Sequence, residues 1–183
     1  LEVVNLTGAP CPVDVKRSMI EWWGPVIREG YGATESGGLT YIDSADWFRQ
    51  PVTGISHIPW QVGHIAMAQY GLCLFRIRGR ADIDTDLMSS SFRKKFSKGT
   101  TPDPDPARNP SVEEIRRVFE RVFEQSMVEL PGVTEPNLDE PVDMPYTAVA
   151  TKFGGLLFCS HHEMLHAGQI GLLRRQLGKV PVR

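Results

Sequence analysis

The feature that most constrains the fold is a long segment with helical periodicity near the C-terminus, from about Thr147 to about Leu177. Apolar residues recur along it at every third or fourth position, and Gly178 and Pro181 end the pattern. At ~1.5 Å rise per residue, a helix of roughly 30 residues is about 45 Å long. A segment of this length and pattern favours a helical fold.

Two other segments show the same periodicity. One opens at Ile58 with a proline in its first turn, and it is expected to end near Gly79. The other begins at the N-cap Ser111, has Glu114 at the capping-box position, and runs to about Leu130. Both present a broad apolar face of the kind that helices bury against one another.

The remaining segments are predicted to be a connection between helices and an N-terminal part that is not mainly helical. Residues 80–110 are predicted to be a long, solvated polar loop, because charged residues and prolines dominate them. Pro51-Val52-Thr53-Gly54 marks the expected domain boundary. Residues 1–54 read as a small α/β-like segment, with a short strand, a helix and a second strand. Residues 55–183 are predicted to form a mainly α domain with up to three long helices.

Histidines are concentrated in the C-terminal helical segment. His162 and His166 are four positions apart, so a helix places both imidazoles on one face. Two imidazoles in this arrangement can share one divalent metal ion. Two further histidines, His57 and His64, lie upstream, and His64 falls within the apolar stripe of another helix. The pattern predicts a metal site.

Neighbours of the histidine pair leave several alternatives open. Cys159, one turn before His162, is either a fourth metal ligand or a buried thiol. Gln169 is either a partner of the site or a packing residue, and His161 is expected either at the surface or as a partner of a metal ligand. His162-Glu163-x-x-His166 also fits the metalloprotease signature, with Glu163 as general base, although no His, Asp or Glu follows His166.

Composition narrows the classes of partner. The net charge of -2 gives no basic field, so neither nucleic acid nor a membrane surface is an expected partner. No apolar run approaches the ~20 residues that a membrane span needs. The three cysteines suit a reducing compartment, and the sequence shows no signal peptide, so a cytoplasmic location is expected.

Residues 55–183 resemble the DinB/YfiT-like superfamily of metal-binding four-helix bundles. The resemblance rests on Ile58-Pro59-Trp60-Gln61-Val62-Gly63-His64-Ile65-Ala66 and on the segment from His162 to Arg175. It implies a DinB-like four-helix bundle in which His64, His162 and His166 bind a nickel or zinc ion. It also implies a small-molecule substrate, with a low-molecular-weight thiol as one candidate. A homodimer is expected, because without a fourth helix one side of the apolar stripes stays exposed.

Residues 1–50 resemble a fragment of the AMP-forming adenylating enzymes, the acyl-CoA synthetases and their relatives. The resemblance rests on Leu6-Thr7-Gly8-Ala9-Pro10-Cys11-Pro12 and on Gly30-Tyr31-Gly32-Ala33-Thr34-Glu35-Ser36. The other motifs of that family are missing from the sequence, so adenylating activity is not expected. The fragment stands where the DinB-like bundle has its first helix. Either residues 1–54 replace that helix as a fusion, or residues 13–24 supply a short substitute.

The sequence therefore predicts a divalent-metal-dependent enzyme, a thiol-linked transferase or hydrolase with three histidine ligands and one open coordination position. No Asp or Glu is clearly placed as a general base, so the catalytic residues stay unknown. For that reason a non-catalytic, stress-related protein that binds a metal or another ligand is the alternative.

Overall fold

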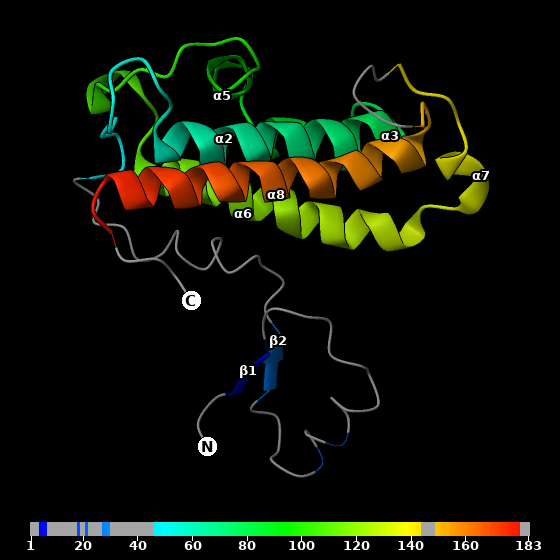
Figure 1. The fold of residues 1–183 in the computed structure, drawn as a ribbon. Helices are drawn as coiled ribbons and strands as arrows, with labels where there is room; N and C mark the ends of the chain where they lie inside the picture. The colour runs from blue at the N-terminus through cyan, green and yellow to red at the C-terminus, as the bar shows by residue number, and fades with distance from the viewer. Residues whose placement is uncertain are drawn as a thin grey trace.

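The computed structural model describes residues 4–6, 18, 21, 27–29, 46–143 and 149–179. Three long helical stretches dominate the described part and lie side by side (Figure 1). The first is α2 (Ile58–Gln69), continued by a π-helical segment, η3 (Tyr70–Phe75), and by α3 (Arg76–Arg78). The second is α6 (Val112–Glu129), and the third is α8 (Lys152–Gln176). The mainly helical fold and the three long helices are thus confirmed.

Helix α2 is the central element, because it packs against both α6 and α8. Its apolar residues form one core with residues from α6 and α8. The fully buried members of this core include Ile58, Leu74, Ile115 and Val122, each at 0% exposure. The shared core therefore fixes α6 and α8 relative to α2. A site built from residues of two helices requires such a fixed arrangement.

The helix boundaries follow capping chemistry. The Ser111 hydroxyl accepts a hydrogen bond from the Glu114 N–H at 3.1 Å, so the predicted N-cap is confirmed. The predicted start of the last helix near Thr147 was wrong. The Thr151 hydroxyl caps α8 by accepting from the Gly154 N–H at 3.2 Å, and α8 has 25 residues. A side chain at Gly154 would meet the carbonyl of Val149, so the chain turns tightly into the helix there.

Short helices follow the first long stretch: α4 (Asp84–Leu87), α5 (Ser90–Lys95) and η4 (Pro106–Arg108). The prediction of a solvated loop over residues 80–110 was wrong for this region. Phe92 and Phe96 insert into the main core at 2% and 0% exposure. Two aromatic residues four apart fall on one side of a single helical turn, so α5 covers part of α2 in spite of its charged sequence.

An ion-pair network ties the far end of the first stretch to its neighbours. Asp84 is buried and accepts hydrogen bonds from Arg78 at 2.7 Å and from the Tyr70 hydroxyl at 3.0 Å. Arg78 also pairs with Glu129 at the end of α6 at 2.5 Å. The Arg78 guanidinium holds the pKa of the Asp84 carboxyl below its usual range, against the opposing effect of burial. These contacts join α3, α4 and α6.

The remaining elements are small. After α6 come η5 (Leu130–Gly132) and α7 (Glu135–Leu138). In the N-terminal part, strands β1 (Val4–Leu6) and β2 (Ile27–Glu29) pair in parallel, with Val4 opposite Ile27. Both lie within the two strands that the sequence predicts. The Gly30–Ser36 motif, and most of the predicted helix from Asp14 to Trp23, lie outside the described residues.

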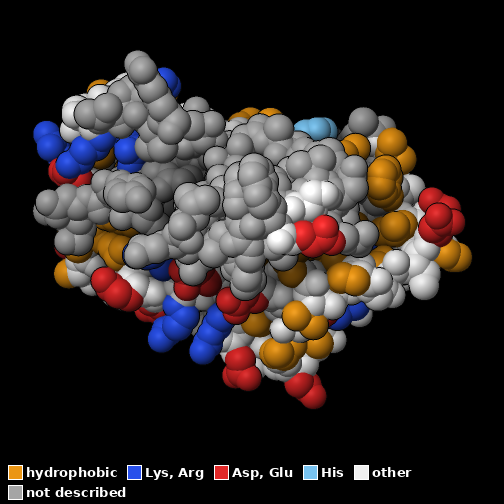
Figure 2. Space-filling model, turned by 90° about the horizontal axis from the view of Figure 1, so that it is seen from below, with side chains coloured by type: hydrophobic (Ala, Val, Ile, Leu, Met, Phe, Trp, Pro, Cys, Tyr) orange, Lys and Arg blue, Asp and Glu red, His pale blue; other side chains and the backbone are white. Residues whose placement is uncertain are grey.

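Hydrophobic side chains also reach the surface. From below, they appear beside acidic groups, mostly toward the end of the bundle where α7 lies (Figure 2). Helix α8 contributes several that are about half exposed: Phe153, Leu157, Met164, Leu165 and Leu172. Among the described residues, no helix combines the length and the apolar character that crossing a bilayer requires.

His57 is fully buried and caps α2, so it takes a structural role. Its Nδ1 accepts a hydrogen bond from the Trp60 N–H at 3.2 Å. Its Nε2 therefore carries the proton and donates to the Asp103 carbonyl at 2.9 Å. The cap bond to Nδ1 needs the neutral ring, whereas Nε2 keeps its proton in either form. Burial lowers the pKa of His57 from 6.5 to about 4, against the hydrogen bond to Asp103.

His57 is expected to make the protein sensitive to mild acid. The pKa of His57 is lower in the folded state than in the unfolded chain. Its contribution to the unfolding free energy is therefore complete above pH 6.5 and is lost as the pH falls toward 4. The loss should approach about 3 kcal/mol. His57→Asn, which keeps a capping oxygen, should make the dependence of the unfolding free energy on pH between 7 and 4.5 less steep, leaving the part due to His64, His162 and His166. Urea titrations of metal-free protein measure this, with exposed His161→Asn as the control. Equal slopes in the two variants would contradict the assignment.

Candidate metal centre

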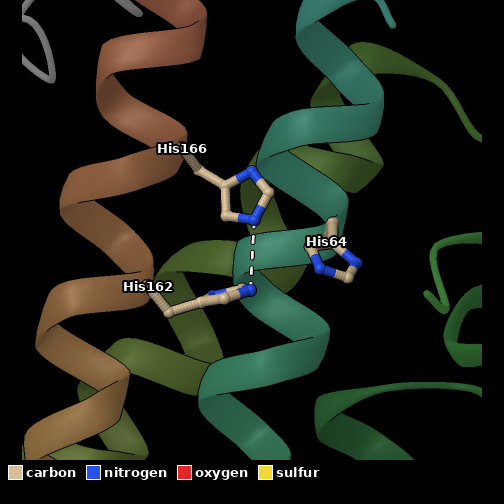
Figure 3. Close-up of side chains that lie close together, drawn as sticks. All are labelled: His64, His162 and His166. Atoms are coloured by element: carbon tan, nitrogen blue, oxygen red, sulfur yellow. Dashed lines mark hydrogen bonds between the residues drawn. The ribbon is translucent and has the colours of Figure 1, made fainter. Parts of the chain in front are cut away.

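Helices α2 and α8 bring three histidines together. His64 belongs to α2, while His162 and His166 project from successive turns of α8 toward α2 (Figure 3). One nitrogen from each ring lies within 4.8 Å of the others. The ring centroids are 5.1 Å apart for His64 and His162, 4.9 Å for His64 and His166, and 4.4 Å for His162 and His166. The three predicted site residues therefore share one location.

The separation of the nitrogens suits a metal ion. Nε2 of His162 lies 3.1 Å from Nε2 of His166, the contact dashed in Figure 3. Ligand atoms placed 2.0–2.1 Å from a tetrahedral ion lie roughly 3.3 Å from one another. The pair already has about this spacing, and a ring nitrogen of His64 lies within 4.8 Å of theirs.

Hydrogen bonds on the outer side of two rings fix which nitrogen is free. Nδ1 of His64 donates to the Phe96 carbonyl at 2.7 Å, and Nδ1 of His166 donates to the Gln61 side-chain oxygen. Because carbonyl oxygens only accept, both protons sit on Nδ1, and the Nε2 lone pairs face inward. Metal-binding histidines in proteins are held in this way.

His162 has no such anchor. Its Nδ1 is buried and finds no hydrogen-bond partner in the described part of the chain. Its Nε2 faces Nε2 of His166, whose proton is on the other nitrogen. Two lone pairs that face each other repel, so this contact requires either a proton on Nε2 of His162 or a cation between the rings. The residues present thus fit a bound metal.

Burial keeps the three rings in the form that binds metals. Desolvation lowers the pKa of His162 to about 4, and the neighbouring His64 adds to the effect. The pKa of His166 is also lowered to about 4, chiefly by desolvation and then by His162 and His64. Burial lowers the pKa of His64 as well, against the hydrogen bond to Phe96. Neutral imidazoles with free lone pairs are therefore expected near pH 7.

Aromatic rings close two sides of the cluster. The Trp60 ring stacks on His64, with centroids 4.7 Å apart and planes 9° apart. Its indole N–H donates to the Thr100 hydroxyl at 3.0 Å, which fixes the ring. Phe158 packs against His162 with a centroid distance of 5.6 Å. These contacts restrict the ring orientations and exclude water from the outer faces of two ligands.

The other sequence candidates lie elsewhere or play other parts. His57 caps α2 and is absent from the histidine group of the described residues, and His161 is exposed as predicted. Cys159 is a buried thiol whose sulfur contacts Cys73 at 3.5 Å, and it is not in that group either. Exposed Gln169 interacts with His166 and raises the pKa of His166, against the effect of burial.

Glu163 is not among the residues that gather at the candidate metal centre, where a metalloprotease would need its general base. Its carboxylate accepts from the Cys159 thiol at 3.7 Å, and the group of three metal-binding candidates does not include it. The third imidazole of the cluster is His64, which lies upstream, whereas the protease signature needs a ligand downstream. The geometry therefore disfavours the metalloprotease alternative.

Sequence reasoning missed Gln61 and the carbonyl of Phe96. Gln61 lies three positions before His64, on the same face of α2, and it is 3% exposed. A buried glutamine in an apolar helix requires a polar partner, and that requirement was the available signal. The Phe96 carbonyl carries no signal in the sequence, because any residue has one.

Gln61 is expected to support metal binding through His166. Gln61→Leu keeps the size of the side chain but leaves the Nδ1 proton of His166 without an acceptor. Loss of such a partner typically costs 10–100-fold in metal affinity, so zinc affinity should fall by roughly that factor. Competition with a chromophoric chelator measures it, and Gln69→Leu, also buried on α2, is the matched control. Equal zinc affinities in the two variants would show that Gln61 does not position the ligand.

A comparison with protein families agrees with the geometry. The family model described as the DinB superfamily matches residues 39–170, a range that includes all three histidines. No curated protein and no solved structure matches the chain. The match begins at residue 39. The resemblance of residues 1–50 to adenylating enzymes stays a prediction, and so does the domain boundary at residue 54.

Proposed function

The chain belongs to the DinB superfamily, and from this premise we propose that it is a divalent-metal-dependent enzyme. The proposed reaction is thiol-linked group transfer or hydrolysis on a small molecule. The observation that carries the proposal is the convergence of His64, His162 and His166 from two helices onto one point. Three imidazoles leave one position of a four-coordinate ion for water or substrate, which is typical of catalytic sites.

The proposed ligand atoms are the three Nε2 atoms, with nickel or zinc as the proposed metal. A bound ion of this kind supplies Lewis acidity, which lowers the pKa of a bound water or thiol. The chain contributes orientation: the Phe96 carbonyl holds His64, and Gln61 holds His166. Trp60 and Phe158 keep water from the outer faces of the rings.

A metal-bound thiol gives a direct test. We expect the cobalt-substituted protein to develop a sulfur-to-metal charge-transfer band when a low-molecular-weight thiol such as mercaptoethanol is added. Zinc should suppress the band by displacing cobalt, and His161→Ala should retain it. Cobalt binding without such a band would leave the metal site standing but would contradict a thiol as substrate.

One observation favours a second candidate, a non-catalytic protein that binds a metal or another ligand. Among the described residues, the candidate metal group holds three imidazoles and no carboxylate, so a general base is missing from it. The two candidates differ in solvent exchange. Water-proton relaxation of the copper- or manganese-loaded protein should rise if an exchangeable water occupies the metal, as the enzyme requires. No rise would favour the binding protein.

We also propose that two copies associate through α8. Phe153, Leu157 and Met164 are 52%, 47% and 65% exposed, and their spacing of four and seven residues places them on one face. The same face on a second copy can meet it across a twofold axis. Light scattering should give twice the chain mass, and Leu157→Glu should give the single mass. A wild-type monomer at micromolar concentration would contradict the dimer.

A further inference from the structure

Two cysteines that the proposed function does not use lie in contact between the first and last helical stretches. Cys73 belongs to η3, and Cys159 belongs to α8, 86 positions further along the chain. Their sulfurs are 3.5 Å apart, and the two residues are 7% and 3% exposed. Both are free thiols. Contact between sulfurs so distant in sequence is a property of the tertiary fold.

The π-helical segment accounts for the placement of Cys73. Its Leu72, Cys73 and Leu74 are all buried, although three consecutive residues of a regular α-helix point in different directions over more than half a turn. The widened turn brings Cys73 toward α8. There, Leu72, Cys73 and Cys159 form a small apolar cluster, separate from the main core.

Neither sulfur belongs to the candidate metal group of the described residues. Cys159 accepts from the Cys73 thiol, and its own thiol donates to the Glu163 carboxylate at 3.7 Å. The pair is therefore free for chemistry of its own. A soft metal ion would need further ligands, and within the described residues no group of three His, Cys, Asp or Glu side chains gathers around these sulfurs.

We propose that Cys73 and Cys159 are a redox-active pair that hydrogen peroxide converts into a reversible intramolecular disulfide. The sulfurs must approach from 3.5 Å to the ~2.05 Å of a disulfide bond. Rotation about the two Cα–Cβ bonds supplies a movement of this size, because the side chains already face each other. The new bond would join the stretch that carries His64 to the helix that carries His162 and His166.

The reaction balances in two steps. The Cys73 sulfur, the more exposed of the two, attacks one peroxide oxygen; a sulfur–oxygen bond forms, the oxygen–oxygen bond breaks, and the thiol proton leaves with the other oxygen as water. The Cys159 sulfur then attacks the sulfenic sulfur of Cys73. The sulfur–sulfur bond forms, the sulfur–oxygen bond breaks, and the departing hydroxide takes the Cys159 proton as a second water. Two thiols are oxidised, and one peroxide is reduced.

Burial of the two thiols affects the rate of their oxidation, and the disulfide affects the stability of the protein. The hydrogen bond from Cys73, followed by burial, raises the pKa of the Cys159 thiol, so the pair should react more slowly than an exposed cysteine. The disulfide closes a long loop and restricts the unfolded chain, so the oxidised protein should melt at a temperature several degrees higher than the reduced one. Its histidines keep all their nitrogens, so zinc binding should survive oxidation.

Peptide mapping of the full-length protein tests the proposal. The reduced protein is treated with graded hydrogen peroxide, its remaining thiols are alkylated, and it is digested without reductant. We expect a linked pair of peptides containing Cys73 and Cys159, lighter by two hydrogens and separated again by dithiothreitol. Cys11→Ser should keep the link, and Cys73→Ser or Cys159→Ser should remove both the link and the rise in melting temperature.

Two results would overturn the proposal. One is alkylation of both cysteines after peroxide treatment at levels that fully oxidise a peptide thiol. The other is a link, within or between chains, that involves Cys11 in place of either residue. The linked-peptide measurement uses the wild-type chain, so the result stands even if a serine variant folds poorly.

Discussion

His166→Ala is expected to release the metal from the protein. The substitution removes one of three nitrogens and leaves His64 and His162 as the only imidazoles of the described group. It also leaves the buried Gln61 oxygen without the Nδ1–H that it accepts from. Affinity should fall by more than the 10–100-fold that loss of an outer partner costs. Thiol coordination should disappear with the metal.

His161→Ala provides the matched control, because His161 lies on the same helix and is exposed. Elemental analysis of the two variants after dialysis against zinc should give about one ion per chain for His161→Ala and almost none for His166→Ala. Circular dichroism should show the same helix content in both, since alanine favours helix. Equal zinc contents in the two variants would show that His166 is not a ligand, and would contradict the proposed chemistry.

The part of the site that could be predicted from the sequence is the part encoded by local spacing. His162 and His166 share a helix, and a separation of four residues fixes their common face whatever packs against it. His64 lies on another helix, and its approach to the pair depends on how α2 packs against α8. Periodicity predicts that both helices are amphipathic, but it does not give their relative register. The family resemblance supplied that link.

The partners of the ligands were beyond prediction for a related reason. The hydrogen bond from His64 to the Phe96 carbonyl spans 32 positions, and that between His166 and Gln61 spans 105. The region around Phe96 also carries three consecutive basic residues, Arg93, Lys94 and Lys95, which dominate its composition. Two aromatic residues in one short helix are too few to establish a period. The burial of Phe92 and Phe96 therefore appears only in the tertiary structure.

Phe96 links the core to the site. Its side chain is fully buried, and its ring lies directly over Gly63, where an added Cβ would come within 2.6 Å of ring carbons. Its carbonyl accepts from Nδ1 of His64 at 2.7 Å. The same residue thus fixes α5 against α2 and orients one proposed ligand. A substitution that disturbs the packing of the Phe96 ring should therefore also disturb the orientation of the His64 imidazole.

Phe96→Ala is therefore expected to lower both stability and metal affinity. Removal of a fully buried phenylalanine ring leaves a cavity and typically costs about 3–5 kcal/mol of unfolding free energy. Phe123→Ala is the matched control; that ring is 40% exposed on α6, so its loss should cost about 1 kcal/mol or less. Urea unfolding of metal-free protein measures both.

Zinc titration of the two folded variants then separates packing from ligand orientation. The alanine at position 96 still has a carbonyl, but without the ring to hold α5 against Gly63 its position is less fixed, so zinc affinity should fall in Phe96→Ala and not in Phe123→Ala. A large loss of stability with unchanged zinc affinity would show that the carbonyl keeps its place without the ring. Equal losses of stability in the two variants would contradict the central position of Phe96 in the core.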